Sequence, residues 1–215
     1  MIVFLSGSLH NFCQSVSASI PQLPNKNDNY LFYLHGGVVS IKGDKGINDA
    51  MPEWGPYEYL NILDSLKHRG FHVISEIRPR DISDTAYAEK IIRQVDTLFK
   101  AGIHARNILI LGASAGWGIG ILVSGRLAQD DLSYVLMGGC WPDTYKDYIS
   151  TPLHGRFLSI IEKTDPHGTC KALFKDRPGL SWREIELNTG LSHGFIYKGH
   201  KAWIDPVVSW FNENR

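Results

Sequence analysis

From Asn29 onward, short apolar runs alternate with longer segments in which apolar residues recur at helical spacing. This alternation is typical of a mostly parallel sheet covered by helices, because parallel strands need long crossover connections. We therefore expect an α/β fold, a three-layer sandwich around a sheet of about six to seven strands. The apolar runs predict strands at residues 30–34, 72–76, 107–111, 133–137, 157–161 and 183–187.

The segments between these runs predict helices. The clearest covers residues 83–100, where apolar residues recur at three- and four-residue steps between Ser83, a candidate cap, and Gly102, a candidate stop. A second helix is expected at 57–67, and its buried side would carry the leucines at 60, 63 and 66. Further helices are expected at 117–127 and at 200–212, the last interrupted near Pro206 because proline cannot donate a backbone hydrogen bond.

The interval 38–56 has no clear periodicity and is rich in glycine and proline. A loop this long in a compact domain usually borders a functional site. A surface loop that borders no functional site is an equally reasonable interpretation.

The bulk composition narrows the function classes. With 215 residues, 43% of them hydrophobic, the chain can form one well-buried core, so residues 19–215 are expected to be a single domain. Lys plus Arg equals Asp plus Glu at 22 each, so no global field favours nucleic acid or an anionic membrane. No apolar run reaches the about 20 residues of a transmembrane helix.

Residues 1–18 allow two interpretations. An apolar start and the small residues at 16–18 resemble a signal peptide, but no Lys or Arg precedes Lys26, so the segment is either a truncated signal peptide or an N-terminal arm. Export to the periplasm or outside the cell is favoured, with the cytoplasm as the alternative.

Three scattered cysteines, Cys13, Cys140 and Cys170, do not suggest a disulfide scaffold or a paired zinc site, and we expect small buried hydrophobic residues. Cleavage after Ala18 would remove Cys13 and leave two thiols able to pair.

A serine follows the strand expected at 107–111, in the sequence Gly-Ala-Ser-Ala-Gly at 112–116. A strand-to-helix turn can hold such a serine exposed for attack on a carbonyl, and the flanking glycines remove Cβ atoms that would collide there. Ser114 is therefore the candidate nucleophile. The pattern alone is equally compatible with a tight turn, because Gly, Ala and Ser are common residues.

A nucleophilic serine needs a histidine to take its proton and an acid to orient that histidine, and in open parallel sheets the chain order is serine, acid, histidine. Asp165, after the strand at 157–161, is the first choice for the acid, and Asp143, after the strand at 133–137, is the alternative. His193, beyond the strand at 183–187, is the candidate base. His200, at the start of the last helix, fits better as a capping or solvent-exposed histidine.

Stabilising a tetrahedral oxyanion requires two backbone N–H donors. The residue after the nucleophile, Ala115, supplies one. The other is expected near Gly37, in the sequence His35-Gly36-Gly37 after the first core strand, where adjacent glycines let amides approach a substrate. A sharp turn alone is the alternative explanation for these glycines.

Two further side chains are possible substrate contacts. Arg78 lies at the sheet edge where ligands collect and could hold a carboxylate or phosphate, although pairing with a nearby Glu76 or Asp81 is favoured. Trp117, one turn past the serine, is expected to pack rather than to touch substrate.

No metal site is expected from the residues around Asp165. His167 and Cys170 follow it, but two ligands on one loop with no distant partner are poor evidence for a metal. The chemistry expected of the serine, histidine and acid also needs no organic cofactor.

Together these parts resemble the α/β-hydrolase superfamily over residues 30–210. The segments 57–59, 73–79 and 112–114 also look like a group of small, mostly uncharacterised bacterial α/β hydrolases. The resemblance implies Ser114 as nucleophile, His193 as base, Asp165 as its orienting acid, and the amides of Gly37 and Ala115 as the oxyanion hole. Only about twenty residues separate 137 from 157, so the cap domain that many members carry is not expected.

The expected function is therefore hydrolysis of a carboxylic ester, or a related acyl bond, of a small molecule through an acyl-serine intermediate. Thioesterase or peptidase-type cleavage would use the same residues. A catalytically silent binding module is the alternative, and it would be expected to have lost a member of the triad. The sequence does not indicate an oligomeric state.

Overall fold

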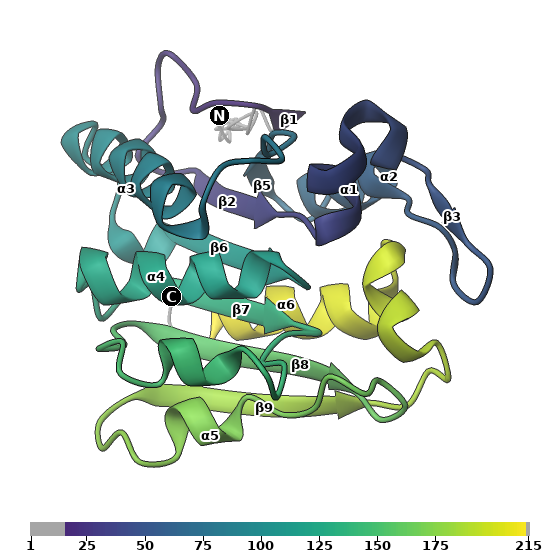
Figure 1. Cartoon of the computed structure of the whole chain (residues 1–215). Helices are drawn as coiled ribbons and strands as arrows, with labels where there is room; N and C mark the ends of the chain where they lie inside the picture. The colour runs from purple at the N-terminus through teal and green to yellow at the C-terminus, as the bar shows by residue number, and fades with distance from the viewer. Residues whose placement is uncertain (1–15, 214–215) are drawn as a thin grey trace, which may run out of the picture.

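The structure of the chain, a computed structural model, describes residues 16–213. Its main sheet has seven strands in the order β1–β5–β2–β6–β7–β8–β9, and all neighbouring strands in it are parallel (Figure 1). The strands are β1 (Val16–Ser17), β2 (Asn29–Leu34), β5 (Phe71–Ile74), β6 (Ile108–Ala113), β7 (Ser133–Met137), β8 (Arg156–Glu162) and β9 (Ser181–Leu187). Every predicted strand is present, and the expected parallel sheet is confirmed. Most of the segment 1–18, with Cys13, lies outside the described residues.

Helices cover both faces of this sheet. On one face, α2 (Tyr59–Lys67) and α6 (Lys201–Asn212) pack against alternate strand residues such as Leu31 and Leu109. On the other face, α3 (Asp84–Lys100), α4 (Gly116–Leu127) and α5 (Lys171–Phe174) pack against the intervening residues, such as Phe32 and Ile110. Because both faces of the central strands are covered, their sequences are continuous apolar runs. The three-layer sandwich is confirmed (Figure 1).

Helix boundaries agree with the sequence more closely than helix faces do. Ser83 caps α3, its hydroxyl accepting the N–H of Ala86 at 3.2 Å. In α2 the buried residues are Tyr59, Ile62, Leu63 and Leu66, whereas Leu60 is 58% exposed. The expectation that Leu60 faces the core is therefore wrong, because the aromatic Tyr59 occupies the buried side of the first turn.

Helix α6 is continuous through Pro206, so the interruption expected there is wrong. Its buried side carries Trp203, Ile204, Val207 and Phe211 on both sides of the proline. Burial of these side chains stabilises the helix enough to offset the missing hydrogen bond. His200 caps α6, its ring nitrogen accepting the N–H of Ala202 at 3.1 Å, which confirms the expected cap.

The interval 38–56 is more regular than its sequence suggests. It contains α1 (Gly37–Lys42), a 3-10 turn η1 (Gly43–Gly46), and the two-stranded antiparallel pair β3 (Ala50–Met51) and β4 (Gly55–Pro56). Each element is too short to show a period in the sequence. By contrast, the segment 138–155 between β7 and β8 holds only the 3-10 turn η3 (Tyr145–Tyr148), and the expected absence of a cap domain there is confirmed.

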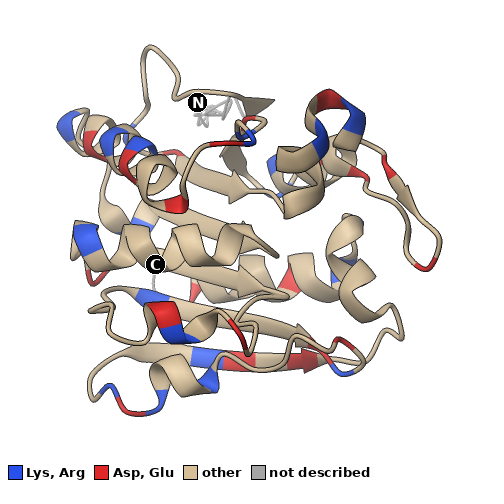
Figure 2. Ribbon diagram, in the orientation of Figure 1, with Lys and Arg blue, Asp and Glu red and all other residues tan. Residues whose placement is uncertain are grey.

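Charged residues are interspersed in sign over the helices and loops, while the central strands carry almost none (Figure 2). This distribution agrees with the zero net charge of the sequence. Among the helices of residues 16–213, none has both the length and the apolar composition needed to cross a membrane.

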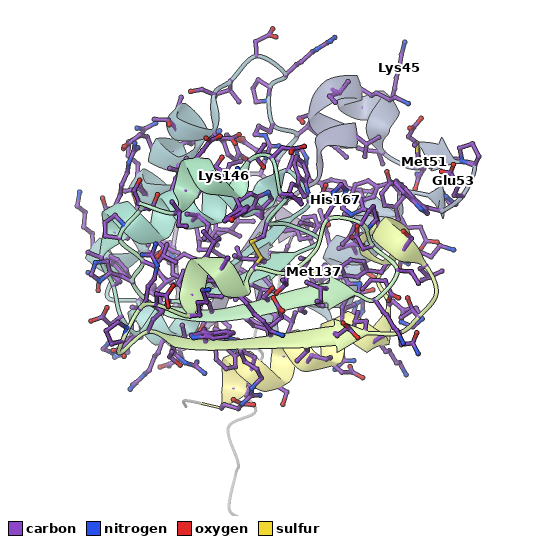
Figure 3. The ribbon with its side chains drawn as sticks, turned by 60° about the horizontal axis from the view of Figure 1, so that its bottom comes forward. Lys45, Met51, Glu53, Met137, Lys146 and His167 are labelled. Atoms are coloured by element: carbon purple, nitrogen blue, oxygen red, sulfur yellow. A yellow bond between two sulfur atoms is a disulfide. The ribbon has the colours of Figure 1, made fainter. Side chains whose placement is uncertain are left out.

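Cys140, after β7, and Cys170, before α5, form a disulfide with Cα atoms 5.2 Å apart (yellow bond in Figure 3). Both cysteines are buried, as expected, but they are not free thiols, and the alternative that these two pair is the one the structure has. Strands β7 and β8 are neighbours, so the loops that follow them lie close enough for the two sulfurs to meet. The bond fixes the segment after Asp165 to the segment that carries Trp141.

Reducing this disulfide is expected to lower the free energy of unfolding. The bond closes a chain segment with a sequence separation of 30 residues, for which the lost chain entropy corresponds to about 3–4 kcal/mol. Urea unfolding with and without dithiothreitol measures the effect. The double variant Cys140→Ser/Cys170→Ser should show the same loss and no response to the reductant. A wild type indifferent to reductant would contradict the pairing.

Candidate active site

The turn between β6 and α4 presents Ser114 at the carboxyl end of the sheet. Ser114 has φ +47°, a left-handed conformation that costs a non-glycine residue about 1–2 kcal/mol. Two hydrogen bonds hold it there: its N–H donates to Met137 O at 2.8 Å, and its carbonyl accepts the N–H of Trp117 at 2.9 Å. The serine is therefore fixed on a tight turn, as the sequence predicts.

The two glycines of this turn are required by close backbone approach. A Cβ on Gly116 would lie 2.1 Å from Leu34 O of the neighbouring strand β2. A Cβ on Gly112 would lie 2.5 Å from Gly116 O across the turn itself. Either contact is far inside van der Waals distance, so a larger residue would push α4 away from β2 and move the serine.

Ser114, His193 and Asp165 form a continuous hydrogen-bonded chain. His193 Nε2 lies 2.9 Å from Ser114 Oγ, and His193 Nδ1 lies 2.7 Å from Asp165 Oδ2. The three come from different segments: the turn after β6, the 3-10 turn η4 (Ser192–Tyr197) beyond β9, and the loop after β8. Parallel strands end at one edge of the sheet, so these segments meet there. Asp143, the alternative acid, is exposed on the loop after β7. The acid that forms the hydrogen bond with His193 is Asp165.

The surroundings of Asp165 and His193 determine which atoms of the two residues carry a proton. Although burial opposes ionisation of Asp165, hydrogen bonds from His193 and from the backbone N–H of His167, 3.0 Å from Oδ1, keep its pKa below the usual value. A carboxylate can only accept, so His193 carries its proton on Nδ1 and Nε2 is free to accept from the serine hydroxyl. The rings of Trp54 and His167 flank His193, with centroids 5.6 and 4.4 Å from it.

Two backbone segments beside Ser114 present helix N-termini. Gly37 is the first residue of α1, Ala115 immediately precedes α4, and a Cβ built on Gly37 would lie 3.7 Å from the Ala115 Cβ. The first N–H groups of a helix have no acceptor within that helix. The structure therefore places the two expected donors next to each other and next to the serine.

The ring of His35 holds the loop that carries Gly37. Its Nε2 accepts the backbone N–H of Arg78 at 2.9 Å, so its Nδ1 carries the proton and donates to Gly36 O at 2.8 Å. In a planar trans peptide the C=O and the following N–H point in opposite directions. Fixing the Gly36 carbonyl therefore aims the Gly37 N–H away from the His35 ring. Burial lowers the pKa of His35 to about 4, so the ring stays neutral.

A cavity of about 390 Å³ opens beside Ser114 and His193. Its walls are mostly apolar, from α1, β3, η4 and the loop after β7, and the segment 38–56 does border it, as the sequence suggested. The sequence alone does not identify most of the lining side chains, because all but Lys42 are ordinary apolar and aromatic residues with no motif around them. They are Val38, Ile41, Lys42, Met51, Tyr57, Trp141, Ile196 and Tyr197.

Comparison with known proteins identifies the fold but no sequence relative. No protein-family model matches the sequence, and no curated protein matches it. Solved structures do match: an arylesterase (14% identity, TM-score 0.54, 89% of this chain and 76% of that chain) and esterase B from Lactobacillus Rhamnosis (14%, 0.59, 86% and 76%). A third is the RedJ thioesterase from Streptomyces coelicolor (13%, 0.52, 97% of both chains).

This chain has the α/β-hydrolase fold. At these identities the likeness concerns the fold alone. It agrees with the resemblance seen in the sequence.

Within this α/β-hydrolase fold, the two possible substrate contacts lie outside the cavity wall. Trp117 is buried and packs edge-on against Tyr148 at 4.8 Å, which confirms the packing interpretation. The Arg78 guanidinium lies 5.6 Å from the centre of the Tyr87 ring. Glu76, one of the two partners expected for Arg78, pairs instead with Lys90 at 2.6 Å. Arg78 contributes to the site through its backbone N–H on His35.

Gly116→Ala is expected to destabilise this fold by about 3 kcal/mol, because overpacking against a backbone carbonyl forces the chain to shift. Gly120→Ala, on the same helix, is the matched control: its Cβ would meet only Leu136 Cδ2, at 3.4 Å. In the control, replacing a helical glycine should be neutral or stabilising by up to about 1 kcal/mol. Chemical unfolding compares the two. Similar stabilities of both variants would contradict the proposed close approach.

His35 is expected to make folding stability fall in acid. Its pKa is about 4 in the folded chain against 6.5 for free histidine, so the unfolded chain binds the extra proton between these values. The free energy of unfolding should fall by up to about 3 kcal/mol between pH 7 and pH 4 through this group. In His35→Gln, whose amide can make both hydrogen bonds without titrating, that part of the fall should be absent. Equal pH slopes in urea unfolding would refute this assignment.

Proposed function

We propose that this chain is a serine hydrolase that cleaves a carboxylic ester of a small molecule through an acyl-serine intermediate. The observation that carries the proposal is the hydrogen-bonded chain from Asp165 through His193 to Ser114, at 2.7 and 2.9 Å, beside the N–H groups of Gly37 and Ala115. A serine oriented in this way next to two donors is the arrangement that acyl transfer requires.

In the proposed mechanism, Ser114 Oγ attacks the substrate carbonyl carbon while its proton passes to His193 Nε2. The resulting oxyanion accepts hydrogen bonds from the N–H groups of Gly37 and Ala115, and Asp165 stabilises the imidazolium. His193 then gives the proton to the leaving alcohol oxygen, which leaves an acyl-serine. A water molecule, deprotonated by His193, attacks the acyl carbon, and collapse of the second tetrahedral species releases the acid and restores Ser114.

Esters are favoured among the possible acyl bonds because similar folds include an arylesterase and an esterase. Thioester cleavage is the second candidate, since a thioesterase also shares the fold. The same residues would serve both substrates. A leaving thiol would depend less than an alcohol on protonation by His193. A catalytically silent binding module is disfavoured, because the proposed serine, histidine and acid are all present and within hydrogen-bonding distance of one another.

The proposed place of action is an oxidising compartment, the periplasm or the exterior of the cell. The disulfide between Cys140 and Cys170 supports this, because such bonds persist where thiols are not kept reduced. This is also the compartment that the signal-peptide interpretation of residues 1–18 requires.

Replacing the proposed acid tests whether Asp165 itself, rather than any acidic residue of these loops, orients His193. Asp165→Asn should reduce kcat by about 10⁴-fold, because an amide selects the wrong histidine tautomer. Asp143→Asn, which changes an exposed carboxyl on the neighbouring loop, is the matched control and should keep activity within about twofold. Ser114→Ala should be inactive. Turnover of p-nitrophenyl esters measures all three, and equal losses in the two Asp variants would refute the assignment.

The apolar cavity predicts a preference for acyl groups longer than acetyl. Each methylene buried there contributes up to about 0.8 kcal/mol, so p-nitrophenyl hexanoate should exceed the acetate in kcat/KM. Val38→Phe, which narrows the cavity, should lower kcat/KM for the hexanoate by about tenfold and leave the acetate nearly unchanged. An equal loss on both esters would contradict the placement of the acyl group in this cavity.

A further inference from the structure

The His167 side chain lies against the proposed active site but has no part in the proposed reaction. Its ring meets that of His193 edge-on, with centroids 4.4 Å apart and an interplanar angle of 81° (His167 is labelled in Figure 3). Its side chain is 34% exposed, whereas that of Asp165 is 3% exposed. The His167 side chain is therefore partly accessible to solvent, whereas the carboxylate beside it is buried.

The structure supplies the distant ligand that the sequence around Asp165 lacks. Cys170 is held in the disulfide, but His193, from the turn η4 that follows β9, lies close to Asp165 and His167. One ligand atom from each of these three residues lies within 4.8 Å of the others. His167 Nε2 and Asp165 Oδ1 are 4.0 Å apart. Two ligand atoms of one tetrahedral zinc ion are about 3.4 Å apart. A small side-chain rotation would therefore bring these two atoms to the separation at which both can bind one ion.

The donor set selects the kind of ion. Two imidazoles and one carboxylate suit Zn²⁺ and its neighbours Cu²⁺ and Ni²⁺, whereas Ca²⁺ and Mg²⁺ require oxygen ligands. Three protein ligands leave the fourth tetrahedral position to water.

We propose that Asp165, His167 and His193 bind one divalent transition-metal ion, and that the bound ion inhibits hydrolysis. The inhibitory part rests on the proposed function, whereas the binding part does not. A metal that binds His193 Nδ1 takes the place of the proton donated to Asp165, and the proton moves to Nε2. No proton is gained or lost by the ring. A ring protonated on Nε2 cannot accept the proton of Ser114, so the serine loses its base.

Binding can be tested without any activity. Zn²⁺ is titrated calorimetrically into untagged Ser114→Ala protein, freed of metal by EDTA and then of EDTA, because this variant keeps all three ligands. We expect one Zn²⁺ per chain. A second substitution in this variant, His167→Phe, keeps an aromatic ring against His193 but removes the ligand nitrogen. It should weaken Zn²⁺ binding at least tenfold. His154→Phe is the matched control, since His154 also pairs with a carboxylate, Asp130 at 3.1 Å, and has a similarly exposed side chain.

Inhibition is tested on the enzyme with an intact serine. Zn²⁺ should abolish turnover of a p-nitrophenyl ester, EDTA should restore it, and His167→Phe should raise the half-inhibitory concentration at least tenfold while its thermal unfolding midpoint stays near that of the wild type. His154→Phe should be inhibited like the wild type. No saturable binding, or binding unaffected by His167→Phe, would overturn the metal site even in an active enzyme. Saturable, His167-dependent binding to a chain without hydrolase activity would leave the metal site standing and refute only the proposed function.

Discussion

The close approach of the β6–α4 turn to strand β2 is the constraint on which the site depends. Gly116 lies so near Leu34 O that a Cβ would come within 2.1 Å of it, and the turn that makes this approach carries Ser114 in its left-handed conformation at the sheet edge. The same approach brings the residues after β2, Gly36 and Gly37, beside the serine. A Cβ on Gly36 would lie 3.3 Å from Ser114 Cβ. One packing contact therefore positions both the candidate nucleophile and one candidate donor.

Around this fixed point, the other groups are held by partners that do not themselves touch a substrate. His35 and the backbone N–H of Arg78 orient the peptide before Gly37, and the backbone N–H of His167 holds the second oxygen of Asp165. The disulfide ties the segment after Asp165 to the loop carrying Trp141, a wall of the cavity. Such supporting contacts let a buried carboxylate stay ionised beside a histidine, because each charged or polar atom keeps a hydrogen-bond partner.

The sequence predicts the parts of this structure that depend on local pattern, and it misses those that depend on tertiary contact. Strands buried on both faces appear as unbroken apolar runs, so β2, β6 and β7 are readily found, and the glycines around Ser114 indicate the turn. The face of α2 is not determined by its leucines alone, since Tyr59 takes the place expected of Leu60. Helix α1 is too short to show a period. The pairing of Cys140 with Cys170, the clamp by His35, and the approach of His193 to His167 all join residues from separate loops. No local pattern encodes those contacts.

The central claim is that Ser114 is a nucleophile activated by the fold, and covalent labelling tests it most directly. The folded protein is incubated with a fluorophosphonate and analysed by peptide mass spectrometry, with the urea-unfolded chain as control. The account predicts one adduct, on Ser114, in the folded protein and none in the unfolded chain. A folded protein that acquires no adduct, or that acquires it on another residue, would contradict the account.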